Sequence, residues 1–294
     1  MNYYDEIKRE LINNEINRKV KNYSINRSDL DTYYNVGKML SEAGKHYGEG
    51  IIKEYSIRLT EDLGKGYSQR NLRNMRQLYK VLCLQNRQTV SANLTYSHYC
   101  EIMWLEETQI NYYINITIKY NLSVRELRNK IKNKEYERLP EETKNKLIGK
   151  DEINVTDFVK NPIKIKNNNY EVVSEKVLQK LILEDIENFL KELGDAFCFI
   201  ASEYKIKLGN NYNYIDLLLF NYEYNCFTVV ELKINELKKE HIGQIEVYMN
   251  YIDKNLRKIN QDKTIGIIIC LEDNKYIIKY CSDKRIIARE YELV

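Results

Sequence analysis

The spacing of apolar residues differs between the two ends of this chain, and that difference limits how it can fold. In residues 1–130 the apolar residues recur at intervals of three and four, which is typical of amphipathic helices. After residue 172 they gather in runs rich in β-branched and aromatic residues, such as NYIDLLLFNY and CFTVVELKI. Such runs are typical of buried strands. We therefore expect an α+β multidomain protein, with a mostly α domain over residues 1–135 and a mixed domain over residues 172–294.

Residues 136–171 lie between these two parts and differ from both. The segment NKEYERLPEETKNKL, which leads into this region, is highly charged, and both prolines of the chain, Pro140 and Pro162, fall within the region. Charged sequence with proline is typical of the links between domains. We therefore interpret residues 136–171 as a linker or connecting region.

Cysteine and histidine usage argues against several classes of site. None of the 6 cysteines forms a CxxC pair, and the 3 histidines are far apart in the sequence. This usage disfavours zinc ligands, a disulfide framework and a nuclease of the His-metal type. The amino terminus MNYYDEIKRE lacks the apolar stretch of a signal peptide, and no apolar run reaches the roughly 18 residues of a membrane-spanning helix. We expect a cytoplasmic protein with no membrane association.

One stretch of the helical part has the outline of a helix-turn-helix. Residues 51–63 form an amphipathic pattern, GKGY follows as a turn, and Ser68 can cap the next helix, SQRNLRNMRQLYKVL. Four basic side chains at spacings of three, three and four share one face of that helix: Arg70, Arg73, Arg76 and Lys80. They could contact the phosphates or base edges of DNA. The alternative is an ordinary solvated helix face.

The second domain begins with an amphipathic pattern over residues 174–193, which Gly194 ends as a C-cap. Three strand-like runs follow, and then a helical pattern over residues 238–254. Two more strand-like runs, KTIGIIICLE and KYIIKYCS, precede the tail RIIAREYELV. The expected order is helix, three strands, helix and strand, with one extra strand. This is an αβββαβ domain.

Three charged residues interrupt the strand-like runs of this domain. Asp216 precedes LLLF, and Glu231 and Lys233 follow FTVV. Charge in a buried strand is costly unless it is paired or bound to a metal. Glu231 and Lys233 are two residues apart, so they point to the same face of a strand. A hairpin of this length brings Asp216 beside Glu231.

A divalent cation would bind this pair of carboxylates and give it a catalytic role. Two close carboxylates repel each other, whereas Mg²⁺ or Mn²⁺ prefers oxygen ligands and accepts substrate phosphate as a further ligand. A cation held by Asp216 and Glu231 can activate water, and Lys233 can stabilise charge on a phosphate oxygen. The pattern indicates metal-assisted phosphodiester hydrolysis. The alternative is a structural ion network at the end of a strand.

Long stretches of the sequence also resemble a known protein family. The stretch GDAFCFIASEYKIKLGNNYNYIDLLLFNYEYNCFTVVELKINELKKEHIGQIEVYMNYID is similar to the core of the YhcG-like PDDEXK nucleases, and the similarity continues through TIGIIICLEDNKYIIKY. The pieces YYNVGKML, GKGYSQRNLRNMRQLY, LTYSHYCEIMWLE and NLSVRELRNKIKNKEYERL resemble the N-terminal helical domain of that family. The ELK segment with GQ after it is the most specific part.

The resemblance implies a restriction-endonuclease-like fold and assigns further residues. Asp216 would be the acid of the second core strand, and Glu231 to Lys233 would be the (D/E)XK element. Gln244 and Tyr248 look similar to a QxxxY element that contacts phosphate or holds the lysine. The helix before the strands would supply another acid, for which Glu187 is our choice and Glu184 the rival. Ile215 stands where the superfamily name has proline.

Two functional hypotheses follow from these residues. The first is a Mg²⁺-dependent DNA endonuclease that acts on foreign, damaged or branched DNA. The second is a catalytically inactive module that uses the same fold to bind DNA or a partner protein. No motif separates RNA from DNA, so RNA stays open as a substrate. A homodimer is expected only from the chemistry of cutting both strands of a duplex.

Overall fold

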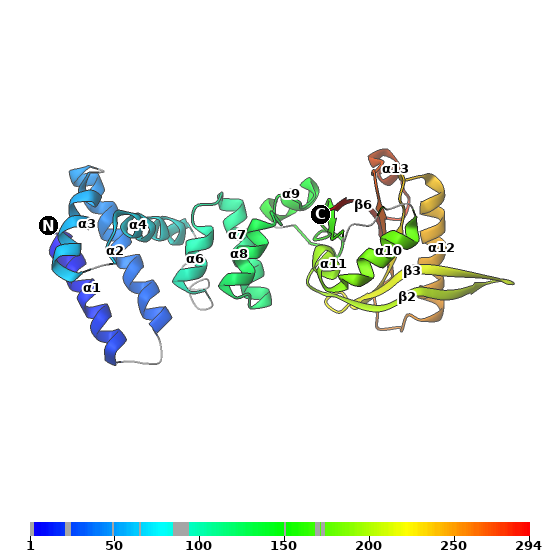
Figure 1. Ribbon diagram of the computed structural model, residues 1–294, viewed down its shortest axis with the longest axis horizontal. Helices are drawn as coiled ribbons and strands as arrows, with labels where there is room; N and C mark the ends of the chain where they lie inside the picture. Colours follow the sequence, from blue (N-terminus) through cyan, green and yellow to red (C-terminus); the bar gives the residue numbers. More distant parts are fainter. Residues whose placement is uncertain are drawn as a thin grey trace. The chain divides into compact units, whose positions relative to one another are not determined.

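The computed structural model describes residues 3–20, 25–48, 50–64, 66–84, 94–149, 151–167, 171 and 174–294. The chain divides into two compact units, Met1–Lys134 and Glu135–Val294 (Figure 1). Within the described residues, no helix is both long and apolar enough to cross a membrane.

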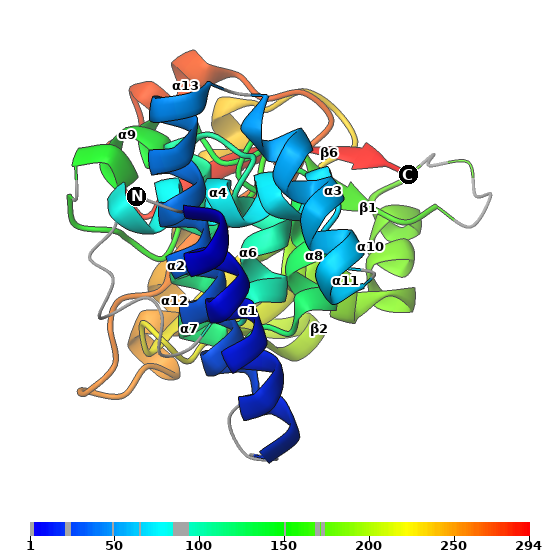
Figure 2. The ribbon, with the colours of Figure 1, turned by 90° about the vertical axis from the view of Figure 1, so that its left-hand side faces the viewer.

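The described part of the first unit is helical, as its sequence predicts. Its helices are α1 (Tyr3–Val20), α2 (Ile25–Tyr47), α3 (Ile51–Leu63), α4 (Gln69–Leu84), α6 (Tyr96–Ile102), α7 (Glu107–Tyr120) and α8 (Val124–Lys132). Figure 2 shows α1 and α2 side by side at this end of the chain. Helices α2 and α4 cross closely at Gly37. A Cβ at this position would lie only 2.1 Å from the carbonyl oxygen of Met75. Only glycine fits this crossing.

Helices α3 and α4 form the predicted pair around a glycine turn. The turn contains Gly64 and Gly66 at φ values of 90° and 131°, which residues with a side chain rarely adopt. The hydroxyl of Ser68 then accepts a hydrogen bond of 3.3 Å from the N–H of Asn71, in the first turn of α4. Leu72 and Leu78 are fully buried on the inner face of α4.

The second unit contains a six-stranded mixed sheet with helices. Its elements are α9 (Glu141–Gly149), β1 (Ile163–Ile165), α10 (Glu175–Glu184), α11 (Ile186–Leu193), β2 (Phe197–Leu208), β3 (Asn211–Asn221), β4 (Cys226–Leu232), α12 (Lys239–Asn255), β5 (Ile265–Cys270), α13 (Lys275–Lys279) and β6 (Ile286–Leu293). The strand order is β1-β6-β5-β4-β3-β2. Strands β2, β3 and β4 pair antiparallel, and β4, β5, β6 and β1 pair parallel.

Each face of the sheet is covered by its own hydrophobic cluster. Helices α10 and α11 pack on one face, where Leu178 and Phe189 join Leu217 and Val230. Helix α12 packs on the other face through Ile245, Met249 and Ile252. This helix lies close to β5 because position 266 is glycine, where a Cβ would meet the sulfur of Met249 at 2.6 Å. The two layers hold β3 and β4 in the middle of a well-packed unit.

The region expected to connect the two domains contributes structure to the second unit. Helix α9 lies in it, and β1 extends the sheet beside β6. Arg138 forms a bidentate ion pair with Glu192 of α11, and its guanidinium also donates to the carbonyl of Pro162 at 3.0 Å. The described part of residues 135–171 therefore packs as part of the second unit. The charged composition and the prolines of this region do not reveal the Arg138–Glu192 ion pair that joins it to α11.

Two expected elements have a different form in the structure. The single helix predicted over residues 174–193 is wrong, because the chain breaks at Asp185, with φ −135° and ψ 50°, into α10 and α11. The carboxylate of Asp185 accepts bonds of 2.8 and 2.9 Å from Asn188. The strand predicted for KYIIKYCS is also wrong, since its first residues form α13. So short an apolar run carries no period that separates a helix from a strand. The last strand, β6, comes from the tail instead.

Candidate active site

The carboxylate of Asp216 lies next to the end of β4. The last paired residues of β3 and β4 are Leu217 and Val230, so Asp216 and Glu231 come one position beyond them on adjacent strands. Asp216 Oδ2 accepts a hydrogen bond of 2.8 Å from the backbone N–H of Leu232. The expected juxtaposition of Asp216 and Glu231 is therefore present.

The β2–β3 hairpin is irregular at the level of Asp216. Ile215 packs on the α12 side of the sheet, whereas Leu217 packs on the α10 side. Residues two apart normally share a face, so the alternation changes at Asp216. Its neighbour across the hairpin is Glu203, whose φ of 47° is left-handed. Because such a backbone costs about 1–3 kcal/mol for a residue with a side chain, the surrounding structure must hold it in place.

The backbone of Asp216 is held from the opposite direction by α10. The side-chain amide of Gln179 donates to the carbonyl oxygen of Asp216 at 2.9 Å. Burial raises the pKa of the Asp216 carboxyl, and the Leu232 N–H and the Lys233 ammonium oppose that rise. The position of this carboxylate is thus fixed by contacts from β4 and α10.

Glu231 is the most deeply buried charged group of the site. It is 2% exposed, and its Oε1 atom has no hydrogen-bond partner in the structure. Burial and then the repulsion from Asp216 raise the pKa of Glu231 to about 8. An isolated carboxylate in such a place holds its proton near neutral pH. A cation beside Asp216 and Glu231 would remove that preference.

Lys233 follows β4 and is fixed at both ends. Its backbone N–H donates to Ile269 of β5 at 2.8 Å. Its ammonium lies 3.5 Å from Glu231 Oε2 and 3.3 Å from Glu175 Oε1. Burial lowers the pKa of Lys233, but the carboxylates of Glu231 and Glu175 outweigh burial, and the net pKa is raised. Lys233 therefore carries its positive charge into the site.

Helix α12 places Gln244 over the carboxylate of Glu231. The side-chain amide of Gln244 donates to Glu231 Oε2 and to the hydroxyl of Tyr248, both at 3.2 Å. Tyr248 lies one helical turn after Gln244 and is 6% exposed. The structure thus brings together Asp216, Glu231, Lys233 and Gln244, with Tyr248 behind Gln244.

The acid contributed by the preceding helix is Glu175 in this structure. It stands in the first turn of α10, which packs against β4. Glu187 lies on α11 instead, is 81% exposed and binds Lys191 at 2.5 Å, while Glu184 lies 3.8 Å from Lys180. The structure does not bring Glu187 to Lys233. Glu175 lies on α10, which packs against β4, whereas α11, which carries Glu187, packs against β1 and β2.

The basic face predicted on α4 is present in the first unit. Arg70, Arg73 and Lys80 are exposed, and Arg76 is half-buried. Their spacing places them opposite the buried face formed by Leu72 and Leu78, as the pattern of the sequence predicts.

The donor set at Asp216 and Glu231 fits a hard divalent cation better than a softer metal. Both are carboxylates on adjacent strands, and Glu231 presents a buried oxygen with no hydrogen-bond partner. Among the described residues, no three His, Cys, Asp or Glu side chains converge as a complete metal site. Two protein carboxylates with waters and substrate phosphate are a usual environment for Mg²⁺.

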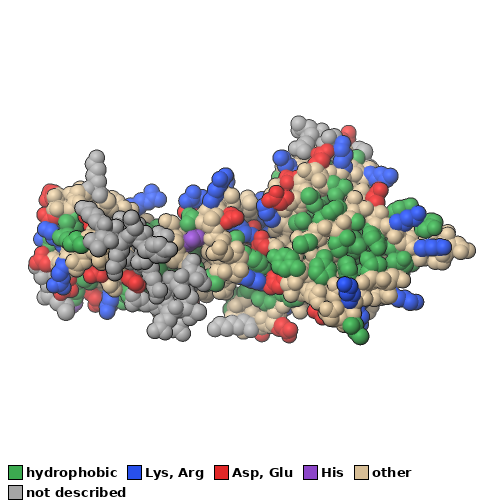
Figure 3. Space-filling model, turned by 90° about the horizontal axis from the view of Figure 1, so that it is seen from below, with side chains coloured by type: hydrophobic (Ala, Val, Ile, Leu, Met, Phe, Trp, Pro, Cys, Tyr) green, Lys and Arg blue, Asp and Glu red, His purple; other side chains and the backbone are tan. Residues whose placement is uncertain are grey.

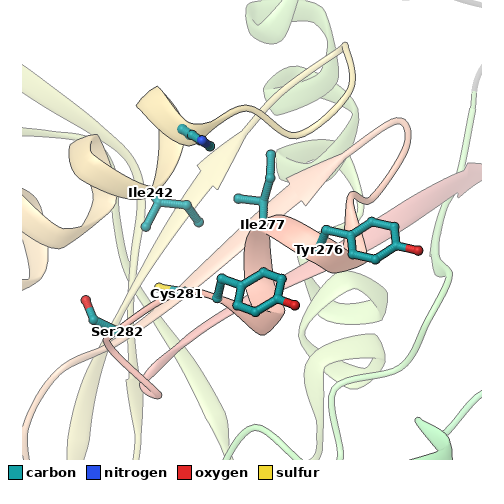
Figure 4. Close-up of a pocket in the computed structure, with 7 residues that line it drawn as sticks. Ile242, Tyr276, Ile277, Cys281 and Ser282 are labelled. Atoms are coloured by element: carbon teal, nitrogen blue, oxygen red, sulfur yellow. The ribbon is translucent and has the colours of Figure 1, made fainter.

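A separate cavity lies between the start of α12 and α13. It has a volume of about 630 Å³, and Ile242 of α12 and Tyr276 and Ile277 of α13 line it (Figure 4). Neither Asp216 nor Glu231 lines it. The carboxylate site is therefore not this cavity.

Comparison with known proteins identifies a family for each of the two units. Residues 156–294 match the family model of the YhcG PDDEXK nuclease domain, and residues 7–138 match that of the DUF1016 N-terminal domain. The Escherichia coli (strain K12) protein named "Putative nuclease YhcG" is 23% identical over an alignment of 317 positions, gaps included, which covers 92% of this chain and 84% of that protein.

Two solved structures are also similar to this chain over 44% of its length. One is a repair endonuclease from Pyrococcus abyssi, with 17% identity, a TM-score of 0.29 and 49% of that chain covered. The other is the EndoMS-dsDNA2 complex, with 18% identity, a TM-score of 0.30 and 48% of that chain covered. The match thus spans about half the length of each of these proteins. The two family models together span most of this chain: residues 7–138 belong to the DUF1016 N-terminal domain family, and residues 156–294 belong to the YhcG PDDEXK nuclease domain family.

Proposed function

We propose that this nuclease is a metal-dependent DNA endonuclease whose cation, Mg²⁺ or Mn²⁺, is held by Asp216 and Glu231. The observation that carries the proposal is the buried Oε1 atom of Glu231, which has no hydrogen-bond partner beside a second carboxylate. A buried polar atom without a partner costs about 1–3 kcal/mol, and more when it is charged. Coordination of a cation gives this oxygen a partner and removes the repulsion between the carboxylates.

The residues around the pair then have distinct roles. The N–H of Leu232 orients Asp216, and the amide of Gln244 orients Glu231. Tyr248 in turn accepts from Gln244 and fixes the rotation of its amide. Such supporting bonds keep metal ligands in one geometry. Gln244 and Tyr248 act as positioning residues in this proposal.

Lys233 supplies a fixed positive charge at the reacting phosphate. When bound, a divalent cation supplies Lewis acidity toward the phosphate and lowers the pKa of water. The ammonium of Lys233, held by Glu175 and Glu231, stabilises the negative charge that develops on a phosphate oxygen. Its raised pKa means that this charge persists at neutral pH.

The helical part, residues 1–135, binds the DNA in this proposal, and residues 172–294 cut it. The basic face of α4, formed by the exposed Arg70, Arg73 and Lys80 with the half-buried Arg76, is the contact that we assign to phosphates or base edges. The helix, glycine turn and second helix of α3 and α4 support a helix-turn-helix role for this part. For cleavage of both strands of a duplex we propose a homodimer, which brings two catalytic sites together.

The experiment that tests the proposal measures cleavage by the full chain. Plasmid, branched DNA and RNA are each incubated with Mg²⁺, with Mn²⁺ and with a chelator. We expect DNA cleavage that needs the metal, is lost in Asp216→Asn and Glu231→Gln, and is kept in Glu187→Gln. Intact DNA under every condition, or equal cleavage by all three variants, contradicts the proposal. Cleavage of RNA alone would replace DNA as the substrate.

A further inference from the structure

The β2–β3 hairpin continues past the catalytic level as an arm of distinctive composition. We call residues 204–215, with the sequence YKIKLGNNYNYI, the hairpin arm. It contains two lysines and three tyrosines but no acidic residue, whereas Glu203 and Asp216 flank it directly. Figure 1 shows this end of β2 and β3 projecting from the second unit. The arm thus begins at the carboxylates and carries only positive charge.

The two faces of the hairpin arm have different environments. On one face Ile206 and Ile215 are buried, and Tyr204 and Leu208 pack partly against the same α12-side cluster. The register pairs Lys205 with Tyr214 and Lys207 with Tyr212, so these four side chains share the other face. One face of the arm is therefore anchored, and the other is open to solvent.

The open face alternates cations with aromatic rings. Tyr212 and Tyr214 are 56% and 52% exposed, and the ammonium of Lys205 lies 3.9 Å from the ring centroid of Tyr212. Seen from below, the tapered end of the second unit carries Lys or Arg side chains next to hydrophobic ones (Figure 3). Lysines that meet phosphates beside rings that stack on bases are the usual surface for unpaired nucleic acid.

The distance from the catalytic carboxylates is short enough for one substrate to reach both. Lys205 and Tyr214 are each two residues from the level of Glu203 and Asp216, or about 7 Å along the strand. Lys207 lies about 7 Å further along. A strand whose phosphate reacts at Asp216 would place its neighbouring nucleotides along this face.

We propose that the hairpin arm binds unpaired nucleotides next to the bond that is cut. The proposal rests on the nuclease function proposed above and narrows its substrate to nucleic acid with a single-stranded segment. A duplex keeps its bases stacked inside and offers the rings of Tyr212 and Tyr214 nothing to stack on. The substrate class is thus branched, frayed or single-stranded nucleic acid.

The test compares two arm variants with a matched control. Lys205→Ala/Lys207→Ala removes the charges, and Tyr212→Ala/Tyr214→Ala removes the rings. Lys254→Ala/Lys258→Ala removes two exposed lysines near the end of α12, roughly 20 Å of helix away from its start at the site. Thermal unfolding and circular dichroism check that each full-length variant is folded.

Binding is measured by fluorescence anisotropy in chelator, with a single-stranded oligonucleotide and with the matched duplex. We expect each arm variant to lose about tenfold in affinity for the single strand and much less for the duplex. In the tyrosine variant this loss is the stacking of about one base, and in the lysine variant it is contact with phosphates. The lysine variant should also reduce the salt slope of single-strand binding by about 1. The control variant should bind like the wild type.

Other results of the binding and cleavage measurements would contradict either the arm proposal or the nuclease proposal. Unchanged single-strand affinity in both arm variants overturns the proposal, and so does an equal loss on single strand and duplex, which indicates phosphate contact alone. A wild-type chain that binds the single strand through the arm but cuts no nucleic acid with any metal contradicts the nuclease proposal and leaves the binding role of the arm supported.

Discussion

Asp216 accepts a 2.8 Å hydrogen bond from the backbone N–H of Leu232, the residue between Glu231 and Lys233. This bond ties the acid of β3 to the strand end that carries the other two charges. It also means that Asp216 has a structural role beside its proposed role as a metal ligand. The two roles can be separated by substitution.

The separation uses two substitutions at one position. In Asp216→Asn the amide oxygen can still accept from Leu232, so we expect a free energy of unfolding close to the wild type but no cleavage. In Asp216→Ala the buried N–H loses its partner, and we expect about 1–3 kcal/mol of destabilisation in addition. Urea unfolding and a plasmid cleavage assay measure both. Equal stability of the two variants would show that the bond contributes little.

Gln244 should affect the metal rather than the fold. Gln244→Leu removes the bond to Glu231 Oε2, so we expect the affinity for Mn²⁺ and the cleavage rate to fall about tenfold or more. Tyr248→Phe removes only the group that accepts from Gln244, and its effect should be smaller. Calorimetric titration with Mn²⁺ gives the affinity. An unchanged affinity in Gln244→Leu would assign this residue a role outside metal binding.

Glu175 and Glu187 form a matched pair of glutamates on neighbouring helices. Glu175 contacts Lys233 and is partly exposed, so an ion pair of about 1 kcal/mol predicts a loss of about fivefold in cleavage rate for Glu175→Gln. Glu187→Gln should cut like the wild type, because its partner is Lys191 on the surface. Initial rates at saturating DNA measure the difference. A larger loss of cleavage rate in Glu187→Gln than in Glu175→Gln would indicate that Glu187, and not Glu175, acts at the site.

The Arg138–Glu192 pair should make stability depend on pH. Burial raises the pKa of Glu192, but hydrogen bonds from Arg138 and the charges nearby outweigh it, and the net pKa lies below its ordinary value of 4.5. The ionised form is thus favoured by folding. Its contribution is present above pH 4.5 and is lost as pH falls through the lowered pKa. Removing one partner of a buried pair costs about 3–5 kcal/mol.

The corresponding measurement is urea unfolding of the wild type and Glu192→Gln from pH 7 to pH 3. We expect the difference in unfolding free energy to be large at pH 7 and to shrink below pH 4.5. Glu187→Gln is the control, because an exposed pair contributes at most about 1 kcal/mol. A difference between wild type and Glu192→Gln that stays constant across the whole range would rule out this linkage.

The basic face of α4 should control DNA affinity and its salt dependence. Arg70→Glu/Arg73→Glu replaces two exposed cations with anions, so we expect weaker DNA binding and a salt slope lower by about 2. Lys53→Glu/Lys132→Glu makes the same charge change on two other helices of this unit and should have a smaller effect. Band shifts at several salt concentrations decide. Equal losses in both variants would point to net charge rather than to α4.

The proximity of Asp216, Glu231 and Lys233 could be predicted because each interrupts an apolar run. Charges placed at the ends of buried strands are rare enough to stand out, and a hairpin of fixed length fixes their register. The helices α3 and α4 were predictable for a similar reason, since a glycine turn separates two clear amphipathic patterns. In these cases local sequence and tertiary packing agree.

Glu175 could not be predicted, because the helical pattern over residues 174–193 contains several glutamates and does not show which of them meets Lys233. The pattern over residues 174–193 is amphipathic throughout, and the family resemblance implied an acid on this segment, for which Glu187 was the choice and Glu184 the rival. The turn at Asp185 redirects the second half of that segment. Glu203 had no signal either, because its left-handed backbone arises from the hairpin around Asp216 and not from the residue itself.

In the proposed function, Asp216 and Glu231 together hold the catalytic cation. Anomalous diffraction from crystals grown with Mn²⁺ tests it most directly. We expect one strong peak within about 2.0–2.3 Å of a carboxylate oxygen from each residue, and no such peak in Glu231→Gln. At saturating Mn²⁺, a peak elsewhere and none beside these two carboxylates would show that they do not hold the cation.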